Sequence, residues 1–401
     1  RKTGAFALQW RPNDDVEVTA QVLRSDYDFS WHDYSFFAYS GQNPMQGYDD
    51  IVVNDRNEFV SGTFQNTPAD SNTSLTKRHS VTTDYSLGAK WTVSPNLILS
   101  TDFQYIDATT KGTRYILGTG MDTTPRYTID FRGDLPRLSV SDAAGNPGYL
   151  ADQANYSGWK FHLDNKDDNE ATEFAWRSDM DLAFDDSFAR SFKAGVRYTD
   201  RDAQNKGNVW RYMYLGAPFS QYPDAQLMQN PITDFFRGDS HTFGPRLTPS
   251  DALVGDYEQT LALFGASPLA FAPNNINDQG EKTYAAYGVL RFGVDDGAVP
   301  FDGNIGIRIV RTKVDSQGVR TGTDAEGGGL LPVDVQQTYT DVLPSLNLRW
   351  MLTDNLQWRF AASRGISRPD LNRLNPNLSL GTATGSDGTT RRTGSAGNPD
   401  L

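Results

Sequence analysis

Apolar and polar residues alternate along many separate stretches of this chain. Between residues 302 and 315, for example, Ile305, Ile307 and Ile309 alternate with Gly306 and Arg308. An alternation with period two predicts a β-strand that has one apolar and one polar face. The pattern predicts ten such strands, at residues 3–11, 16–31, 74–92, 97–112, 171–184, 188–203, 281–294, 302–315, 336–351 and 356–368.

The predicted strands are long, and the connections between them are alternately short and long. A strand that crosses a bilayer at a tilt needs about 9–11 residues, whereas strands of soluble domains are usually about 5–6 residues long. Short turns at one end of the strands and long loops at the other are typical of outer-membrane β-barrels. Here the short connections lie at residues 12–15, 94–96, 185–187, 295–301 and 353–355, and the long ones at about 32–73, 112–170, 204–280 and 316–335.

Two further features distinguish this pattern from that of a soluble antiparallel sheet, which also alternates when one face is wet. The polar face carries formal charges such as Arg177, Asp179 and Arg308, as the wall of a water-filled lumen does. Aromatic side chains, which favour the membrane–water boundary, recur near the short-turn end at Trp10, Trp91, Phe184, Phe292, Trp350 and Trp358. The sequence therefore predicts an all-β membrane β-barrel, built as an antiparallel up-and-down meander with its apolar face outward.

The composition fits a barrel with a wet interior. Aromatic residues make up 12% of the chain, although its mean hydropathy is −0.56. Disordered chains lack aromatic residues, and a barrel needs only every second residue of each strand to be apolar. The sequence has no run of 18 consecutive apolar residues, so it predicts no transmembrane helix.

Charge and residue types argue against several classes of function. The net charge of −13 argues against a nucleic-acid partner, because phosphate binding needs clustered Lys and Arg. The chain has no cysteine and four scattered histidines, so no metal site built on these residues is predicted. Paired acids at residues 14–15, 49–50, 167–168 and 295–296 resemble glycosidase carboxylates, but they lie in turns and loops, where solvated acids are ordinary. We therefore expect no enzyme activity, no catalytic residues and no cofactor.

The acidic stretch at residues 164–170 offers oxygen atoms of the kind that calcium prefers. It does not have the fixed residue spacing of an EF-hand loop, so a solvated loop is the favoured interpretation. Calcium binding by this stretch stays open.

Several short segments resemble one family of membrane receptors. Residues 7–14 resemble an early strand and periplasmic turn of TonB-dependent receptors of the type found in Xanthomonas and Caulobacter, and residues 339–348 resemble a mid-barrel strand. Residues 360–370, which contain Ser367-Arg368-Pro369, are similar to a strand of that family that ends in Ser-Arg-Pro, and residues 397–399 resemble the segment after that strand. The resemblance implies a 22-stranded barrel in the Gram-negative outer membrane, with an N-terminal plug that is gated by TonB.

The resemblance also predicts how much of such a receptor this sequence holds. We expect residues 1–401 to form part of the barrel domain, about ten strands of it, without the plug and without the C-terminal strands. The first predicted strand runs toward a short turn and so needs a partner before it, while residues 397–401 look like a loop. The expected partners are outer-membrane lipid and, through the missing plug, the TonB–ExbB–ExbD complex.

The predicted ligand is a small molecule or an oligosaccharide, bound by aromatic residues of the long connections. Aromatic faces stack on sugar rings while neighbouring polar groups bind hydroxyls. Many members of the family are thought to import plant-derived sugars, which favours carbohydrate over a ferric siderophore. The alternative for each aromatic residue is packing of one loop on another. The candidate ligand-binding residues are Trp31, Trp159, Trp210, Tyr212, Tyr214, Phe235 and Phe236.

Two rival functions remain on the sequence alone. A passive porin or specific channel would have no plug, and a secreted all-β enzyme that degrades polysaccharides would be soluble without detergent. The porin or channel would also have about 16–18 strands with shorter loops.

Overall fold

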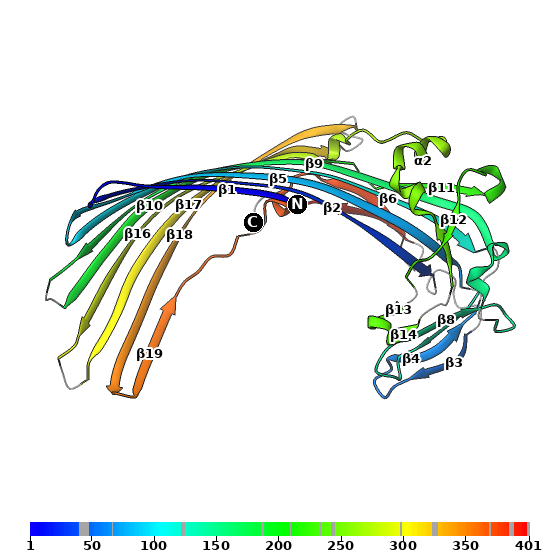
Figure 1. Cartoon of the computed structure of the whole chain (residues 1–401), viewed down its shortest axis with the longest axis horizontal. Helices are drawn as coiled ribbons and strands as arrows, with labels where there is room; N and C mark the ends of the chain where they lie inside the picture. Colours follow the sequence, from blue (N-terminus) through cyan, green and yellow to red (C-terminus); the bar gives the residue numbers. More distant parts are fainter. Residues whose placement is uncertain are drawn as a thin grey trace.

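The computed structural model describes residues 1–39, 48–65, 67–121, 125–146, 148–185, 188–208, 210–232, 234–241, 245–296, 299–322, 328–368, 370–384 and 389–398. Its main unit is one antiparallel sheet in which the long strands follow one another in chain order, from β1 to β19 (Figure 1). These strands are β1 (Lys2–Asn13), β2 (Val16–Ala38), β5 (Ala69–Ser94), β6 (Leu97–Met121), β9 (Tyr156–Ala183), β10 (Ala189–Gly207), β16 (Ile276–Val294), β17 (Phe301–Thr321), β18 (Leu330–Thr353) and β19 (Leu356–Ser363). The predicted antiparallel meander of ten strands is confirmed.

The strands differ from their predicted bounds mainly at the long-connection end. β9 begins at Tyr156 instead of residue 171, and β5 begins at Ala69 instead of residue 74. Hairpin pairing continues there beyond the stretch in which one face must be apolar, so the alternation stops before the strand does. β19 ends at Ser363 instead of residue 368.

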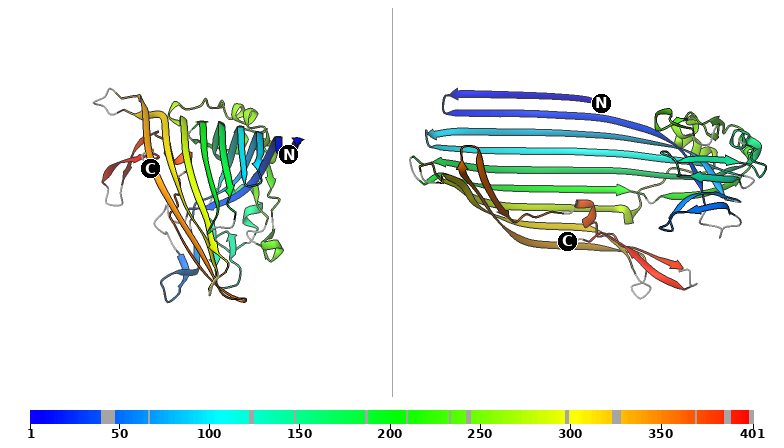
Figure 2. Two further views of the ribbon diagram at one scale, coloured as in Figure 1. Left: turned by 90° about the vertical axis from the view of Figure 1, so that its left-hand side faces the viewer. Right: turned by 90° about the horizontal axis from the view of Figure 1, so that it is seen from below.

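The sheet curves into an arch with a convex and a concave face (Figure 1). Seen from below, the short turns gather at one end of the strands and the long connections at the other (Figure 2). The short helices α1 (Asp251–Gly255) and α2 (Tyr257–Leu263) lie on the convex side at the long-connection end. Among the described residues, no helix is both long and apolar enough to cross a membrane.

The long connections are not irregular loops, as the sequence suggested, but contain small elements of their own. A four-stranded sheet is formed by β3 (Tyr48–Val53), β4 (Phe59–Phe64), β7 (Arg126–Asp130) and β8 (Arg137–Ser141). The remaining strands are β11 (Arg211–Ala217), β12 (Leu227–Gln229), β13 (Asp234–Phe235), β14 (Ser240–His241), β15 (Leu247–Pro249), β20 (Ser379–Thr384) and β21 (Thr390–Ser395). The 3-10 helices are η1 (Tyr149–Ala151), η2 (Gln153–Asn155), η3 (Phe219–Gln221), η4 (Phe236–Gly238), η5 (Pro273–Asn275) and η7 (Leu371–Leu374).

The convex face of the short-turn half is an uncovered apolar band. Ile305, Ile307 and Ile309 are 46–51% exposed, as expected for side chains that face lipid and not a protein core. The register places Ile305 opposite Leu290 on one side and Leu346 on the other, so apolar residues of neighbouring strands share this face. The predicted outward orientation of the apolar residues is confirmed.

Aromatic side chains border the band at both heights. At the short-turn end the rings of Trp350 and Trp358 lie 4.9 Å apart, and Trp10 and Trp91 are exposed on β1 and β5, the two strands that flank β2, in agreement with the predicted aromatic positions. At the other border, register pairs and ring contacts connect a second set, which we call the upper aromatic row: Tyr85, Tyr105, Phe174, Tyr198 and Tyr284.

The concave face of the same strands is polar. Arg177 Nε lies 2.8 Å from Asp102 Oδ2 on the neighbouring strand, and the Tyr287 hydroxyl donates a hydrogen bond to Asp179 Oδ1 at 2.5 Å. Asn347 Nδ2 donates to Asn304 Oδ1 at 3.0 Å. Charges and amides pair with one another here, as in the lumen of a barrel.

The short turns are set by local side-chain hydrogen bonds. Asn13 Oδ1 accepts hydrogen bonds from the backbone N–H groups of Asp15 and Val16, at 3.0 and 2.9 Å, which closes the turn between β1 and β2. The predicted turns at 94–96 and 353–355 are likewise present. Residues 186–187 and 297–298 of two further predicted turns lie outside the described residues.

Candidate functional site

We call the short-turn half of the long strands, which carries the apolar band, the wall. On β2, a row of aromatic rings lies on the concave face beyond the wall, toward the long connections. In the lower part of this strand the concave-facing positions are polar except for Leu23, but from residue 27 onward they become Tyr27, Phe29 and Trp31. The ring centroids of Tyr27 and Phe29 lie 5.8 Å apart, and those of Phe29 and Trp31 lie 4.9 Å apart. The first two rings are exposed and the third is half-buried. Trp31, one of the predicted ligand-binding residues, is therefore the end of a three-ring surface.

A second group of aromatic side chains lies on β11 and just before it. β11 continues the sheet where β10 ends, by pairing with the upper part of β9, and this register brings Tyr212 opposite Leu163. Alternation then puts Trp210, Tyr212 and Tyr214 on the concave face together, with exposed fractions of 46%, 54% and 67%. The Tyr212 ring stacks on that of Phe161 at 5.2 Å. Three of the predicted residues therefore form one open aromatic surface.

Polar groups lie beside this surface. Asp70 is fully buried, and its carboxylate contacts Lys160 Nζ at 2.5 Å and accepts a hydrogen bond from the Tyr39 hydroxyl at 2.5 Å. Burial raises the pKa of Tyr212, and the nearby Asp70 carboxylate raises it further, so this hydroxyl stays protonated as a hydrogen-bond donor. The Arg114 guanidinium carbon lies 5.5 Å from the centre of the Trp210 ring. The exposed ring faces, the Tyr212 hydroxyl and the Arg114 guanidinium thus lie side by side, while Asp70 is held inside by Lys160 and Tyr39.

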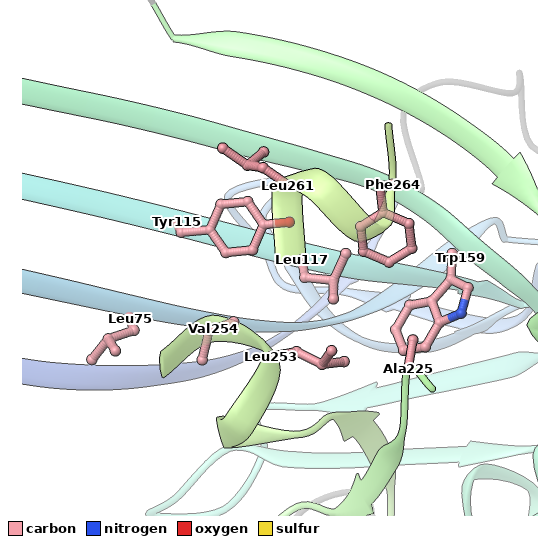
Figure 3. Close-up of a cluster of buried hydrophobic side chains, with 9 residues drawn as sticks. All are labelled: Leu75, Tyr115, Leu117, Trp159, Ala225, Leu253, Val254, Leu261 and Phe264. Atoms are coloured by element: carbon pink, nitrogen blue, oxygen red, sulfur yellow. The ribbon is translucent and has the colours of Figure 1, made fainter. Parts of the chain in front are cut away.

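Trp159 is placed differently from the other predicted residues. Its side chain is fully buried in a cluster on the convex side, where its ring lies 5.2 Å from Phe219 and 5.8 Å from Phe264 (Figure 3). The helices α1 and α2 supply Leu253 and Leu261 to the same cluster. This placement fits the alternative of loop packing.

Phe235 and Phe236 lie apart from both aromatic surfaces. They are at the end of the two-residue strand β13 and the start of the following 3-10 helix, and both side chains are exposed. Phe236 and Arg237 have positive φ angles of 51° and 62°, which shows that this hairpin turns tightly.

The acidic stretch at residues 164–170 is part of strand β9 and not a loop, which corrects the expectation from sequence. Asp164 forms an ion pair with Arg211 at 2.9 Å, and Asp168 forms one with Lys111 at 3.2 Å. In a strand, successive carboxylates point to opposite faces and do not converge on one ion. Among the described residues, one group has metal-ligand spacing, namely Asp26, Asp28 and His79. His79 Nδ1 lies 2.8 Å from Asp28 Oδ1, within hydrogen-bonding distance, and both side chains are exposed.

Sequence reasoning missed Tyr27, Phe29 and Phe161 as members of the aromatic surfaces. A signal for the first two was present, because both fall in phase with polar residues of the same predicted strand instead of with the lipid-facing ones. Phe161 gave no such signal, since it lies in a part of β9 that the alternation did not predict.

Comparisons with known proteins identify a family. The family described as TonB dependent receptor-like, beta-barrel, matches residues 113–401, well over half of the chain. Among solved structures, the chain is similar to the ferric-catecholate import receptor Fiu of E. coli K12 in its open form, with 10% identity and a TM-score of 0.34 over 90% of this chain and 52% of that chain. For the closed form the values are 9%, 0.35, 97% and 58%. The chain is also similar to the ferric yersiniabactin uptake receptor FyuA of Yersinia pestis, with 9% identity and a TM-score of 0.27 over 98% of this chain and 47% of that chain. This chain spans about half the length of these receptors, and no curated protein matches it.

Proposed function

Because the chain belongs to the TonB-dependent receptor β-barrel family, we propose that it forms part of the wall of a receptor that imports a scarce nutrient with energy supplied through TonB. The domain lies in the Gram-negative outer membrane, with the convex apolar band in contact with lipid. The short turns then face the periplasm and the long connections face the outside of the cell. In the proposed receptor, the TonB–ExbB–ExbD complex acts through a plug encoded outside these residues.

We infer further that residues 1–401 are about ten strands of a larger barrel. β1 pairs with β2 and β19 with β18, and among the described residues neither has a partner on its other side. An unpaired backbone N–H or C=O group in hydrocarbon costs several kcal/mol, so spanning sheets are closed. Additional strands that join the free edges of β1 and β19 would remove this cost.

The proposed ligand is a carbohydrate. The observation that supports it is the pair of open aromatic surfaces on the concave face, Tyr27 to Trp31 and Trp210 to Tyr214, at the extracellular end of the wall. Sugar rings present C–H groups that pack on aromatic faces, and the neighbouring Tyr212 hydroxyl and Arg114 guanidinium can bind their hydroxyls. A ferric siderophore is the competing ligand class.

Energy coupling separates this function from passive diffusion. Uptake of a radiolabelled oligosaccharide by cells that carry the full-length receptor is expected to stop when TonB is deleted or the proton-motive force is collapsed. A passive channel keeps its uptake under both conditions, and that result would reject the proposal. A porin of known passive activity in the same cells is the control.

Stacking of a sugar on the aromatic surface of Trp210, Tyr212 and Tyr214 is tested on the purified full-length receptor. The triple replacement of Trp210, Tyr212 and Tyr214 by Ala is expected to weaken oligosaccharide binding by about tenfold or more, at about 0.5–1.5 kcal/mol per aromatic contact. A matched triple Phe variant keeps the rings and is expected to retain most of the affinity. Calorimetry against a panel of neutral and acidic oligosaccharides and ferric siderophores provides the measurement. Unchanged affinity in the Ala variant assigns these residues to loop packing, and binding of ferric siderophores alone rejects carbohydrate.

A further inference from the structure

The concave wall contains a cavity of about 330 Å³ that is lined by an unusual number of arginines. β9, β10, β16, β17 and β18 form its floor, and the segment that follows β19 closes one side. We call it the arginine pocket and define it by six charged residues, Arg197, Arg201, Arg308, Arg368, Glu173 and Glu281.

The pocket lies at the extracellular mouth of the wall. Arg197 is adjacent in the chain to Tyr198, whose ring on the opposite face lies 5.1 Å from that of Tyr284 in the upper aromatic row. Arg201 and Glu281 are opposite one another in the register, farther toward the long connections. A molecule that enters from outside therefore meets these arginines before it reaches the lower part of the lumen.

The acidic groups of the pocket are already occupied. Arg201 Nε lies 3.1 Å from Glu173 Oε2, and Arg201 Nη1 lies 3.8 Å from Glu281 Oε1. Arg368 Nε lies 3.9 Å from the other oxygen of Glu281, while Arg368 Nη2 donates a hydrogen bond to Thr312 Oγ1 at 2.9 Å. Two arginines thus share two glutamates, and the Glu281 side chain is buried between them.

The other two arginines, Arg197 and Arg308, are not neutralised by a nearby carboxylate of the described residues. Within the described part of the chain, neither Arg197 nor Arg308 has a carboxylate oxygen within 4.0 Å. Arg197 also stands directly opposite Arg177 in the register of β9 and β10, and like charges in that arrangement destabilise a sheet. The ion-pair partner of Arg177 is Asp102, which does not contact Arg197. A pocket with four guanidinium groups and two carboxylates is therefore cationic in a chain of net charge −13.

Geometry and chemistry select the kind of anion. Arg197 and Arg308 lie on β10 and β17 with β16 between them and are offset by two residues in register, so their Cα atoms are about 12 Å apart. Long side chains that converge from this separation can hold a carboxylate between them. Guanidinium groups bind planar carboxylates through two parallel N–H donors, and they stay charged at any physiological pH.

We propose that the arginine pocket binds the carboxylate of an acidic sugar, so that the imported ligand is an oligosaccharide that contains uronic acid residues. The sugar part of this inference rests on the proposed function, and the acidic part rests on the pocket. An acidic side chain from elsewhere in the receptor is the competing occupant of the same arginines.

The test uses the full-length receptor with trigalacturonate and its methyl ester, which removes the charge and keeps the sugar rings. The wild-type receptor is expected to bind the acid at least about tenfold more tightly than the ester, with a preference that shrinks as salt is raised. Replacing both Arg197 and Arg308 by Gln is expected to abolish this preference and to leave ester binding unchanged. The double Lys variant keeps the charge and is expected to retain part of the preference. Arg359→Gln, a concave-face arginine near the short turns, is the matched control and should change nothing.

Each outcome of this test decides a separate claim. Equal binding of acid and ester overturns the arginine pocket as a ligand site but leaves a carbohydrate receptor. A Gln variant that binds the acid normally and unfolds more easily assigns the arginines to internal ion pairs. Binding of neither form, with ferric siderophores bound instead, overturns the proposed carbohydrate function itself.

Discussion

The two halves of the long strands have the same alternation but different surroundings. On β6, Phe103 and Tyr105 lie on the convex face of the wall and are 41% and 44% exposed, whereas Tyr115 and Leu117 lie on the same face farther along and are buried. The helices α1 and α2 cover the second pair, whereas the first pair lies in the exposed convex band that we assign to the lipid-facing surface. The apolar face of this one strand is therefore exposed in one half and packed against a small protein core in the other.

This difference shows that packing between apolar side chains stabilises mainly one half of the domain. In the described part of the wall, the two faces meet lipid and lumen, so backbone hydrogen bonds and lipid hold the strands. In the extracellular half, packed clusters hold the connections, and one of them contains Leu75, Tyr115, Leu117, Trp159, Leu253, Val254, Leu261 and Phe264 (Figure 3). A destabilising substitution in one half should therefore leave the stability of the other half unchanged.

The largest expected effect is that of Trp159→Ala. Removal of a fully buried tryptophan leaves a cavity and is expected to destabilise the extracellular cluster by about 3–5 kcal/mol. Hydrogen exchange of residues 250–265 is expected to accelerate, while the wall strands keep their protection. Trp210→Ala, which removes an exposed ring, is the control and should have little effect on exchange. Equal acceleration in the wall would show that the two halves unfold as one unit.

The wall is tested by charge on its convex face. Leu346→Arg is expected to destabilise the full-length receptor by about 2–4 kcal/mol if this residue lies near the bilayer midplane, because lipid cannot solvate the ion. Asn347→Arg places the same charge on the concave face and is expected to cost much less. Reversible unfolding in lipid vesicles measures both. Equal costs would contradict the assignment of the two faces.

The same comparison explains how much of the fold the sequence could predict. All ten long strands were predicted, because lipid on one side and water on the other force a period of two. The upper part of β5 at residues 69–73 was missed, since Asp70, Ser71, Asn72 and Thr73 are all buried and polar, without any alternation. A strand that is covered on both faces has no periodic signal to detect.

The candidate site was predictable in type but not residue by residue. Trp159 and Trp210 both looked like loop tryptophans, yet the first is buried and the second is 46% exposed. The helices at residues 251–263 bury Trp159 and leave Trp210 exposed, and no local sequence pattern reveals which tryptophan they will cover. The arginine pocket likewise needs the register of β9, β10, β16 and β17, which brings together charges that are far apart in the sequence.

A pH dependence is expected in the extracellular half, from His162. Burial lowers the pKa of this histidine from 6.5 to about 4, against a smaller opposite effect of Asp164. Between these pH values the unfolded segment binds a proton that the folded cluster does not. Stability is therefore complete above about pH 6.5 and is lost as the pH falls toward 4, by at most about 3 kcal/mol.

Hydrogen exchange of residues 250–265 at pH 7 and pH 5, expressed as protection factors, measures this effect. His162→Phe keeps an aromatic ring beside Tyr115 and Phe264 and is expected to remove the pH dependence. His79→Gln changes an exposed histidine and is expected to leave it in place. A pH dependence that survives in His162→Phe would point to another titrating group.

The smallest effect is expected in the wall, at the ion pair between Arg177 and Asp102 on its concave face. Their side chains are 57% and 44% exposed, so water screens the attraction even though Nε and Oδ2 are 2.8 Å apart. A double-mutant cycle with Arg177→Gln and Asp102→Asn is expected to give a coupling of about 0.2–1 kcal/mol, which falls as salt is added. The cycle is needed because Arg177 also faces Arg197, and a single replacement would mix the lost attraction with relieved repulsion. A coupling of several kcal/mol that does not respond to salt would mean that the concave face is dry, and that the wall and the extracellular clusters differ less than their surfaces suggest.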